Sequence, residues 1–298
     1  MPAKSIAFIN LKGGVAKTTT TVCLGEVLSG VFGKKVLVID LDPQTNATTM
    51  LIGAVKWLAL DRKSYTLATL FEDALTRKSN FDLSNTLQVS VSDVIEVKTL
   101  DLLPSSLRLI ELQDRLIQMP VNQFGVRNPV TILLRGINRI LNNYDYILID
   151  CPPNLGYITI NGLRIADAYI IPTIPDVLST YGIPQIVTRI NKFSSETSDE
   201  TGHEIEPLGI VATKVRGQAQ IHDRTLSLMR NSAGKPMGNE NLSYPRVFET
   251  YFPESSQMAE AGEFQETRVR LRQKWGNAGQ YKAIESFANE FIKVCGEV

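Results

Sequence analysis

The chain has 298 residues, with 31 basic and 31 acidic side chains, so it can form one large α/β domain or two small ones and carries no formal net charge. This balance excludes nucleic-acid binding driven by global charge and leaves a local basic face as the electrostatic route to such a partner. The three cysteines, Cys23, Cys151 and Cys295, lie far apart in apolar runs. This pattern favours buried free thiols in a reducing cytoplasm. An expected buried strand close to Met1 argues against a signal peptide, and no apolar run reaches membrane-spanning length.

The first strong pattern is a glycine turn between a strand and a helix. Ile6 to Ile9 predicts a buried strand, and Val22 to Leu28 predicts a helix. Backbone N–H groups converge in such a turn and the helix N-terminus adds a positive dipole, so the turn is suited to phosphate. Lys17 would reach the β- and γ-phosphates of a nucleotide, and the Thr18 hydroxyl would bind Mg²⁺.

This turn departs from the strict phosphate-loop pattern, because Leu11 and Ala16 occupy the two glycine positions of G-x-x-x-x-G-K-[ST]. Glycine turns also precede helices for packing alone, which is the alternative interpretation. The segment Lys12 to Thr19 resembles the deviant Walker A motif, usually K-G-G-V-G-K-T-T, of the ParA/MinD family of partition and positioning ATPases. A Cβ at Ala16 requires negative φ, so we expect this residue in the right-handed helical region.

The resemblance assigns roles to this segment. It implies that Lys12 crosses to the nucleotide of the partner subunit in an ATP-sandwich homodimer and acts as a catalytic residue. It also implies that an ATP site is formed by Lys12, Gly13, Gly14, Val15, Ala16, Lys17, Thr18 and Thr19.

A second strand, Lys35 to Asp40, is apolar without alternation, which indicates burial on both faces of a parallel sheet. It is followed by a second carboxylate, Asp42, and open α/β sheets bind ligands at such strand ends. Alternate residues of an extended chain point the same way, so both carboxylates could face one site. The alternative is a solvated Asp-Pro turn. The segment resembles the family's D-x-D-P-Q-x-N, which implies that Asp42 positions the attacking water and that Asp40 supports the Mg²⁺ shell.

The segments that follow give secondary-structure signals but no candidate catalytic residue. Residues 53–100 receive no chemical role, although Tyr65 to Phe71 predicts a helix with Thr66 as its cap. Asp101 to Ser106 predicts a strand and turn that resemble the family's L-D-L-L-P-S-S, and helices are expected from Leu107 and over 130–141.

The third strong signal is an apolar strand, Tyr144 to Asp150, that stops at Pro152-Pro153. An aspartate that closes a buried strand beside a phosphate loop typically holds Mg²⁺ through water, as a Walker B carboxylate does. The alternative is a turn former. With the loop present we favour the metal role, so the predicted metal set is Thr18, Asp40 and Asp150. Asn154 stands where the family usually has serine.

The following strands and helices alternate. A helix from Gly162 feeds a strand over 169–173, a helix begins near Ser179, and 196–206 is a polar surface turn. A strand over 207–214 ends in Thr213 and Lys214. By resemblance these two residues contact adenine, and a solvated strand end is the alternative. Residues 251–253 either wall the adenine or pack in the core.

The densest basic run lies near the C-terminus, between Thr267 and Trp275, with Gly276 as the expected helix end. Nonspecific DNA binding needs such clusters to neutralise phosphates, and the alternative is a solvated basic helix. The resemblance favours DNA, because partition ATPases of this kind bind chromosomal DNA as ATP dimers. The candidate DNA contacts are Arg268, Arg270, Arg272 and Lys274. The last helix, over 281–294, has a mixed-charge polar face, unlike a membrane-targeting helix.

Alternating strands and helices predict an α/β fold: a doubly wound, mostly parallel sheet with helices on both faces. The resemblance implies that this fold is a P-loop NTPase of the deviant Walker type. We expect one ATPase domain over 1–298 without an N-terminal DNA-binding extension. The resemblance implies an ATP- and Mg²⁺-dependent ATPase that dimerises, binds nonspecific DNA, and is stimulated by a ParB-like or other adaptor protein. It would be cytoplasmic, associated with the nucleoid when ATP is bound, and would partition or position a plasmid, chromosome or cytosolic cargo. A MinD-like membrane-cycling regulator and an ATP-dependent metabolic enzyme of the same superfamily are the alternatives.

Overall fold

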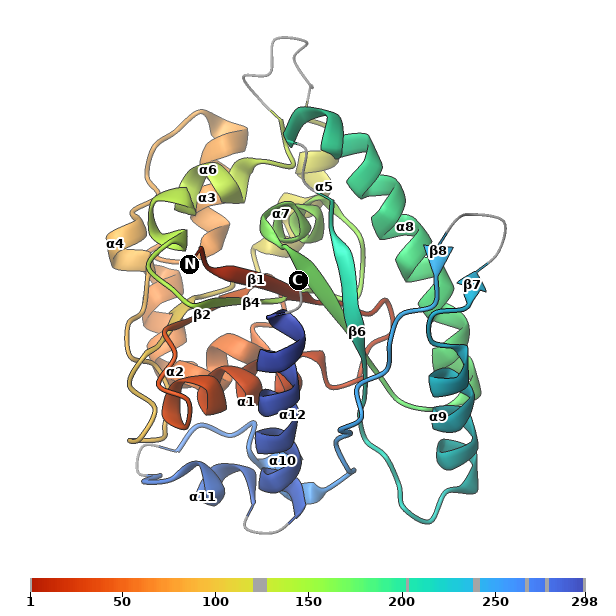
Figure 1. Cartoon of the computed structure of the whole chain (residues 1–298). Helices are drawn as coiled ribbons and strands as arrows, with labels where there is room; N and C mark the ends of the chain where they lie inside the picture. The colour runs from red at the N-terminus through yellow and green to blue at the C-terminus, as the bar shows by residue number, and fades with distance from the viewer. Residues whose placement is uncertain are drawn as a thin grey trace.

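A computed structural model describes residues 2–119, 128–201, 204–237, 242–265, 268–276 and 279–296, of which 196–201 are described by their backbone. Within these ranges, six parallel strands form one sheet in the order β3-β2-β4-β1-β5-β6 (Figure 1). The strands are β1 (Lys4–Phe8), β2 (Val36–Asp40), β3 (Leu100–Leu103), β4 (Tyr146–Asp150), β5 (Ala168–Thr173) and β6 (Glu206–Ala212). A short antiparallel ribbon joins β7 (Pro236–Met237) and β8 (Leu242–Ser243).

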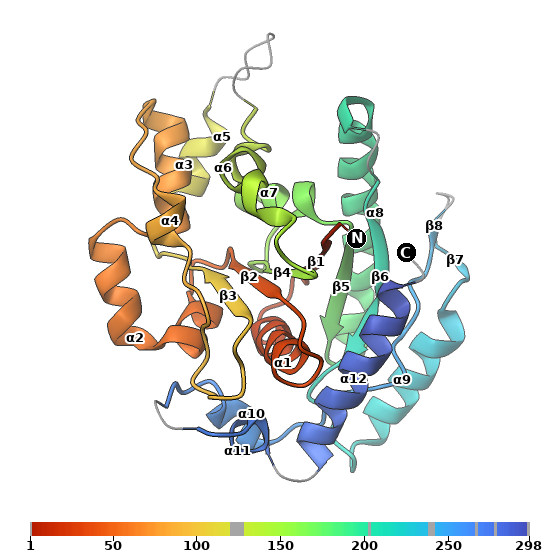
Figure 2. The ribbon, with the colours of Figure 1, turned by 60° about the vertical axis from the view of Figure 1, so that its left-hand side comes forward.

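Helices cover both faces of the sheet, as Figures 1 and 2 show. One face carries α3 (Leu67–Thr76), α5 (Leu109–Ile117), α6 (Ile132–Leu141), α7 (Tyr157–Ile165) and α8 (Val177–Thr201). The other carries α1 (Lys17–Gly30), α2 (Asn46–Arg62), α11 (Leu271–Trp275) and α12 (Gly279–Cys295). The remaining helices are α4 (Leu83–Thr86), α9 (Gln220–Ser232) and α10 (Ser256–Glu260).

The two hydrophobic cores follow from the period-two alternation of strand side chains. In β1, Ile6 and Phe8 pack in the core beneath α1 and α12, whereas Ala7 packs in the opposite core with α7 and α8. In β2, Val36 and Val38 likewise face one core while Leu37 and Ile39 face the other. Because both faces are covered, the strands are apolar throughout, as the sequence indicated.

The register of the central strands gathers the predicted acidic residues. Asp150 at the end of β4 pairs in register with Asp40 of β2 on one side and with Phe8 of β1 on the other. The glycine turn leaves β1 directly after Phe8. The topology therefore brings the turn and two of the predicted carboxylates to one edge of the sheet, as ligand sites of open α/β sheets require.

The predicted α/β architecture is confirmed, and one local prediction is wrong. The polar stretch after Ser195 was expected as a surface turn, but α8 continues to Thr201. The first half of α8 is anchored in the core, for example at Ile183, Ile186 and Ile190, and the helix propagates from there through the polar stretch. Among the described helices, none combines the length and the apolar character needed to cross a membrane.

Candidate functional site

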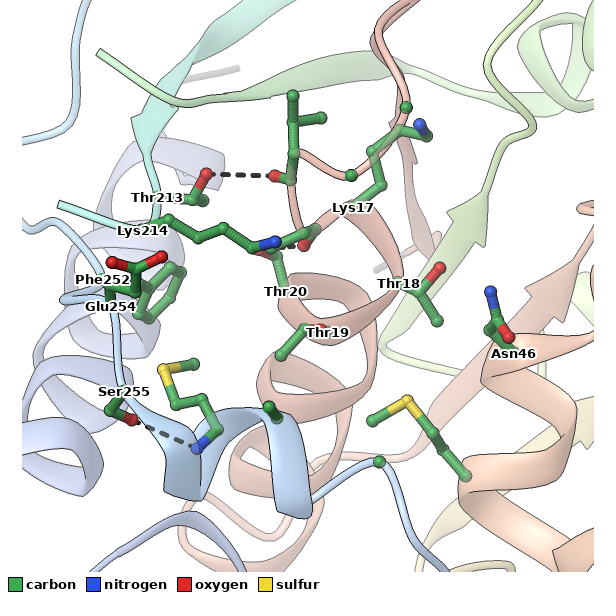
Figure 3. Close-up of a pocket in the computed structure, with 18 of the residues that line it drawn as sticks. Lys17, Thr18, Thr19, Thr20, Asn46, Thr213, Lys214, Phe252, Glu254 and Ser255 are labelled. Atoms are coloured by element: carbon green, nitrogen blue, oxygen red, sulfur yellow. Dashed lines mark hydrogen bonds between the residues drawn. The ribbon is translucent and has the colours of Figure 1, made fainter. Parts of the chain in front are cut away.

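A cavity of about 700 Å³ opens at the carboxyl edge of the sheet. Its walls are the glycine turn and the start of α1, the segment after β2, the end of β6, and residues 252–262. Figure 3 shows Thr18 and Thr19 at the start of α1, with Phe252 and Glu254 on the opposite wall. The cavity has the size of a small-ligand or cofactor site. It unites the predicted residues Gly13 to Thr19 with Asp42, Thr213 and Lys214.

The glycine turn is held open by its neighbours. Asn10 is buried and donates from its amide to the Pro172 carbonyl at 2.8 Å, while its carbonyl oxygen accepts from the Lys12 N–H at 2.9 Å. Gly14 has φ +74°, which favours glycine, and a Cβ at Gly13 or Gly14 would meet no atom within 4 Å. The turn therefore wraps around open space, as a phosphate cradle must.

Ala16 corrects one expectation. We expected a negative φ, but the residue has φ 60° and ψ 31°, in the left-handed region. The Thr20 N–H and hydroxyl both donate to the Ala16 carbonyl, at 3.0 Å and 2.8 Å, and so fix the first turn of α1. Closing the loop onto that turn demands a left-handed residue, which explains why glycine is usual here. Alanine takes this conformation at a strain of roughly 1–2 kcal/mol.

Ala16→Gly is therefore expected to stabilise the chain. Removing the Cβ relieves the strain, although the greater freedom of glycine in the unfolded chain offsets part of it, so the gain is a few tenths to about 1 kcal/mol. Denaturant unfolding measures it. The control is Ala59→Gly on the exposed side of α2, where right-handed geometry makes glycine destabilising by about 1 kcal/mol. Equal losses in both variants would show that Ala16 is unstrained.

The carboxylates form a compact buried group. Asp150 accepts from the Thr18 hydroxyl at 2.7 Å through one oxygen, and its other oxygen, Oδ1, is buried with no hydrogen-bond partner within the described chain. Asp40 accepts from the Thr48 N–H at 2.8 Å and the Thr48 hydroxyl at 2.6 Å. Burial raises the pKa of Asp40 to about 7, and burial followed by repulsion from Asp40 raises the pKa of Asp150 well above its usual value.

This group fits a Mg²⁺ ion. An orphaned buried carboxylate oxygen beside a threonine hydroxyl is a typical pair of hard oxygen ligands. Within the described ranges, no cluster of three or more His, Cys, Asp or Glu could enclose a metal by itself. Mg²⁺ here would hence rely on phosphate and water for its other ligands, as nucleotide-bound Mg²⁺ does. Asp40 already accepts three hydrogen bonds. We therefore expect it to support the metal shell indirectly, without binding the ion itself.

The two lysines of the turn point in different directions. Lys17 is buried, and its ammonium group lies 3.4 Å from the Lys12 carbonyl; burial lowers its pKa, against the attraction of Asp150 and Asp42. Lys12 extends instead to the start of α8, where its Nζ lies 3.2 Å from Asp176 Oδ2 and 2.8 Å from Ser179 Oγ. Sequence analysis missed both partners of Lys12, because more than 160 residues separate them from it.

The far end of the cavity contains both predicted adenine contacts. The Thr213 hydroxyl donates to the Val15 carbonyl at 3.0 Å, so this residue braces the glycine turn from β6. Lys214 has φ 51°, and its side chain reaches across the cavity toward the start of α1 (Figure 3). Phe252 packs on Phe287 in the core, with ring centroids 5.2 Å apart, and it also lines the cavity. Core packing is confirmed for Phe252, and the adenine wall stays a prediction. Asn154 organises the turn before α7, accepting from the Gly156 N–H at 2.9 Å.

Two of the four candidate DNA contacts are wrong. Arg268 is buried and pairs with Asp93, and Lys274 is buried 2.7 Å from both Glu26 and Asp93. These cations neutralise buried carboxylates, so they cannot meet phosphates. Arg270 and Arg272 are exposed and stay predicted contacts. The helix in this run is limited to α11 and ends at Gly276, as expected.

Comparison with known proteins gives consistent family evidence. A protein-family model described as an AAA domain matches residues 3–201. An uncharacterized protein of Mycobacterium tuberculosis is 36% identical over 72% of this chain and 58% of its own length. The sporulation initiation inhibitor protein Soj of Bacillus subtilis is 35% identical over 63% of this chain and 64% of its own. The chromosome partitioning protein ParA of Caulobacter vibrioides is 27% identical over 88% and 85%.

The chain belongs to the ParA/MinD family of ATPases. It spans 58% of the length of the mycobacterial relative and 64% of Soj. Two solved structures share its fold: cobyrinic acid a,c-diamide synthase of Mycobacterium smegmatis, solved with an ATP analogue and magnesium, and apo McdA of Cyanothece. The synthase has a TM-score of 0.68 at 24% identity, and the match covers 98% of this chain and 94% of the synthase. McdA has a TM-score of 0.68 at 21% identity, and the match covers 95% of this chain and 98% of McdA.

Proposed function

We propose that this ParA/MinD-family chain is a Mg²⁺-dependent ATPase that dimerises around ATP, binds DNA nonspecifically in that state, and thereby partitions or positions a cargo. The observation that carries the proposal is the divergence of the two lysines of the glycine turn. Lys17 stays inside its own site, whereas the Lys12 side chain, 42% exposed, leaves it for the surface at the start of α8. A cation placed there is available to a second subunit.

The mechanism assigns each residue a physical role. The turn and Lys17 would hold the triphosphate, and Thr18 and Asp150 would hold Mg²⁺, which would neutralise charge on the phosphates. Asp42 lines the cavity and would orient the water whose oxygen bonds to the γ-phosphorus as the bond to the bridging β-phosphate oxygen breaks. Lys12 of the partner would stabilise the charge that develops. Catalysis of this kind is electrostatic and needs a closed site.

The surface beside Lys12 supports a dimer. Leu178 and Tyr181, on the first turns of α8, are 77% and 71% exposed. They flank the Asp176 and Ser179 contacts of Lys12 and lie three positions apart on α8, so they expose apolar surface next to a cation. Apolar surface beside a cation is suited to contact with a second subunit. Dimerisation would cover it and draw Lys12 away from Asp176, so nucleotide state would act as a switch.

Leu178→Asp is expected to abolish the ATP-dependent dimer. A buried, unpaired carboxylate at a close interface is strongly unfavourable. The wild type with Mg·ATP should elute as a dimer and retard DNA, and with ADP or no nucleotide it should do neither. The variant should bind ATP, stay monomeric and leave DNA unretarded. Val89→Asp, on a residue 64% exposed beside edge strand β3, is the matched control. A monomeric wild type with ATP would refute the switch.

The same proposal includes three further properties: a cytoplasmic location, stimulation by a ParB-like or other adaptor, and one ATPase domain over 1–298. Exposed Arg270 and Arg272 are its DNA contacts. The MinD-like alternative predicts ATP-dependent co-sedimentation with liposomes. The metabolic alternative predicts ADP release that depends on a small-molecule substrate and not on DNA. The DNA shift assay with ATP, ADP and no nucleotide separates both from the partition switch.

A further inference from the structure

A chain of buried hydrogen bonds leads from β3 to the predicted water-positioning aspartate. Ser105, two residues after β3, is fully buried, and its hydroxyl donates to the Asp42 carbonyl at 2.7 Å. The Ser105 N–H donates to the Thr48 hydroxyl at 3.0 Å, and that hydroxyl donates to Asp40 at 2.6 Å. The Thr48 hydroxyl donates its hydrogen bond to the Asp40 carboxylate, so its oxygen is the acceptor for the Ser105 N–H. The direction of each hydrogen bond in the chain is thus defined.

These bonds fix the main chain of Asp42 from both sides. Its N–H donates to Asp40 at 3.1 Å, and its carbonyl accepts from the Thr45 N–H at 2.9 Å as well as from Ser105. The Asp40 and Thr45 contacts are local. The Ser105 contact crosses 63 residues of sequence and ties the loop to the sheet. The backbone of Asp42 is hence held by a group outside its own loop, while its side-chain Oδ1 accepts from the Gln44 N–H at 2.9 Å.

A further contact connects this chain to the outer part of α2. That helix is broken at Gly53, which has φ 76° and ψ 155°. Beyond the break, Trp57 Nε1 donates to the Ser105 carbonyl at 3.2 Å. Ser105 therefore uses its hydroxyl for Asp42, its N–H for Thr48 and its carbonyl for Trp57.

We propose that Ser105 is a positioning residue for ATP hydrolysis: it holds the backbone from which the Asp42 side chain projects, and it is itself braced by Trp57. The inference rests on the proposed function, since Asp42 acts only if ATP is hydrolysed. A displacement of about 1 Å at a reacting group can reduce turnover about a hundredfold, so one buried hydroxyl that fixes Asp42 is sufficient to control the rate. Asp42 itself makes the contact with water.

The test uses the full chain with Mg·ATP and saturating DNA. Ser105→Ala is expected to reduce kcat ten- to a hundredfold, while the Kd for ATP and the ATP-dependent dimer stay as in the wild type. Ser106→Ala is the matched control, because Ser106 is equally buried and its hydroxyl oxygen accepts from the Arg108 N–H at 3.2 Å, away from Asp42. It should lose similar stability and keep kcat.

Trp57→Phe keeps most of the ring and removes only the N–H donor, so it tests the brace even if Ser105→Ala folds poorly. We expect a smaller fall in kcat, and a double variant no slower than Ser105→Ala alone, because both act through one residue. Equal kcat in the wild type and all three single variants would overturn this inference alone. An inactive wild type would overturn the proposed function along with it. A parallel fall in ATP affinity would assign Ser105 to folding of the site rather than to positioning.

Discussion

Lys12→Ala is expected to abolish ATP hydrolysis and to leave ATP binding within a few-fold of the wild type. The Lys12 ammonium group is held at Asp176 and Ser179, outside its own phosphate cradle, whereas Lys17 remains to hold the triphosphate. Loss of one charge-stabilising group in a closed site typically reduces kcat a hundred- to a thousandfold. Single-turnover hydrolysis with labelled ATP measures the loss, and a fluorescent ATP analogue measures binding.

A mixture of two inactive variants shows on which subunit Lys12 acts. Asp42→Ala keeps Lys12, and Lys12→Ala keeps Asp42. If Lys12 works across the dimer, one site of each mixed dimer has both residues, and an equimolar mixture regains about a quarter of wild-type activity by random pairing. If Lys12 works within its own subunit, the mixture stays inactive. Lys12→Ala mixed with Lys12→Ala,Asp42→Ala is the control, because no site there is complete.

The strands and the motifs that follow them could be predicted from sequence, because their signals are local. Apolar runs that end in Asp40 and Asp150 locate strand ends, and the parallel fold then places those ends at one edge. Asp42, Lys17 and Thr18 line or adjoin the cavity for the same reason. In a doubly wound sheet the carboxyl ends of the parallel strands lie at one edge, so residues that follow different strands in the sequence lie close together in space.

Contacts made across long sequence separations could not be predicted. Ser105 was assigned to a turn and Ser179 to a helix start, and neither assignment carries information on Asp42 or Lys12. The φ of Ala16 was inferred from the preference of alanine, but loop closure overrode that preference at a modest strain. Local propensity is a weak prior wherever a functional loop requires one specific conformation.

The basic run near the C-terminus is a further case in which contacts across long sequence separations could not be predicted. It is also the case in which we expect the largest loss of stability on substitution. From sequence, Arg268 and Lys274 belonged to a solvent-facing basic cluster. In the structure the side chains of Lys274, Glu26 and Asp93 are fully buried, and Trp275 Nε1 donates to Glu26 at 2.6 Å. The network fastens α11 to α1, the helix that begins at the phosphate cradle. Charge that compensates buried carboxylates is indistinguishable from surface charge in a composition profile.

Lys274→Ala is accordingly expected to destabilise the chain by about 3–5 kcal/mol, because it leaves Glu26 buried without its cation, while Asp93 keeps Arg268. Denaturant unfolding measures the loss. Lys274→Met, which restores most of the volume, should lose nearly as much, since the missing charge and not the missing packing sets the effect. Lys282→Ala, at an exposed position of α12, should stay within about 0.5 kcal/mol. A Lys274→Ala variant that is as stable as Lys282→Ala but binds DNA more weakly would contradict this role. Lys274 would then be a DNA contact, and the buried network would not hold α11 against α1.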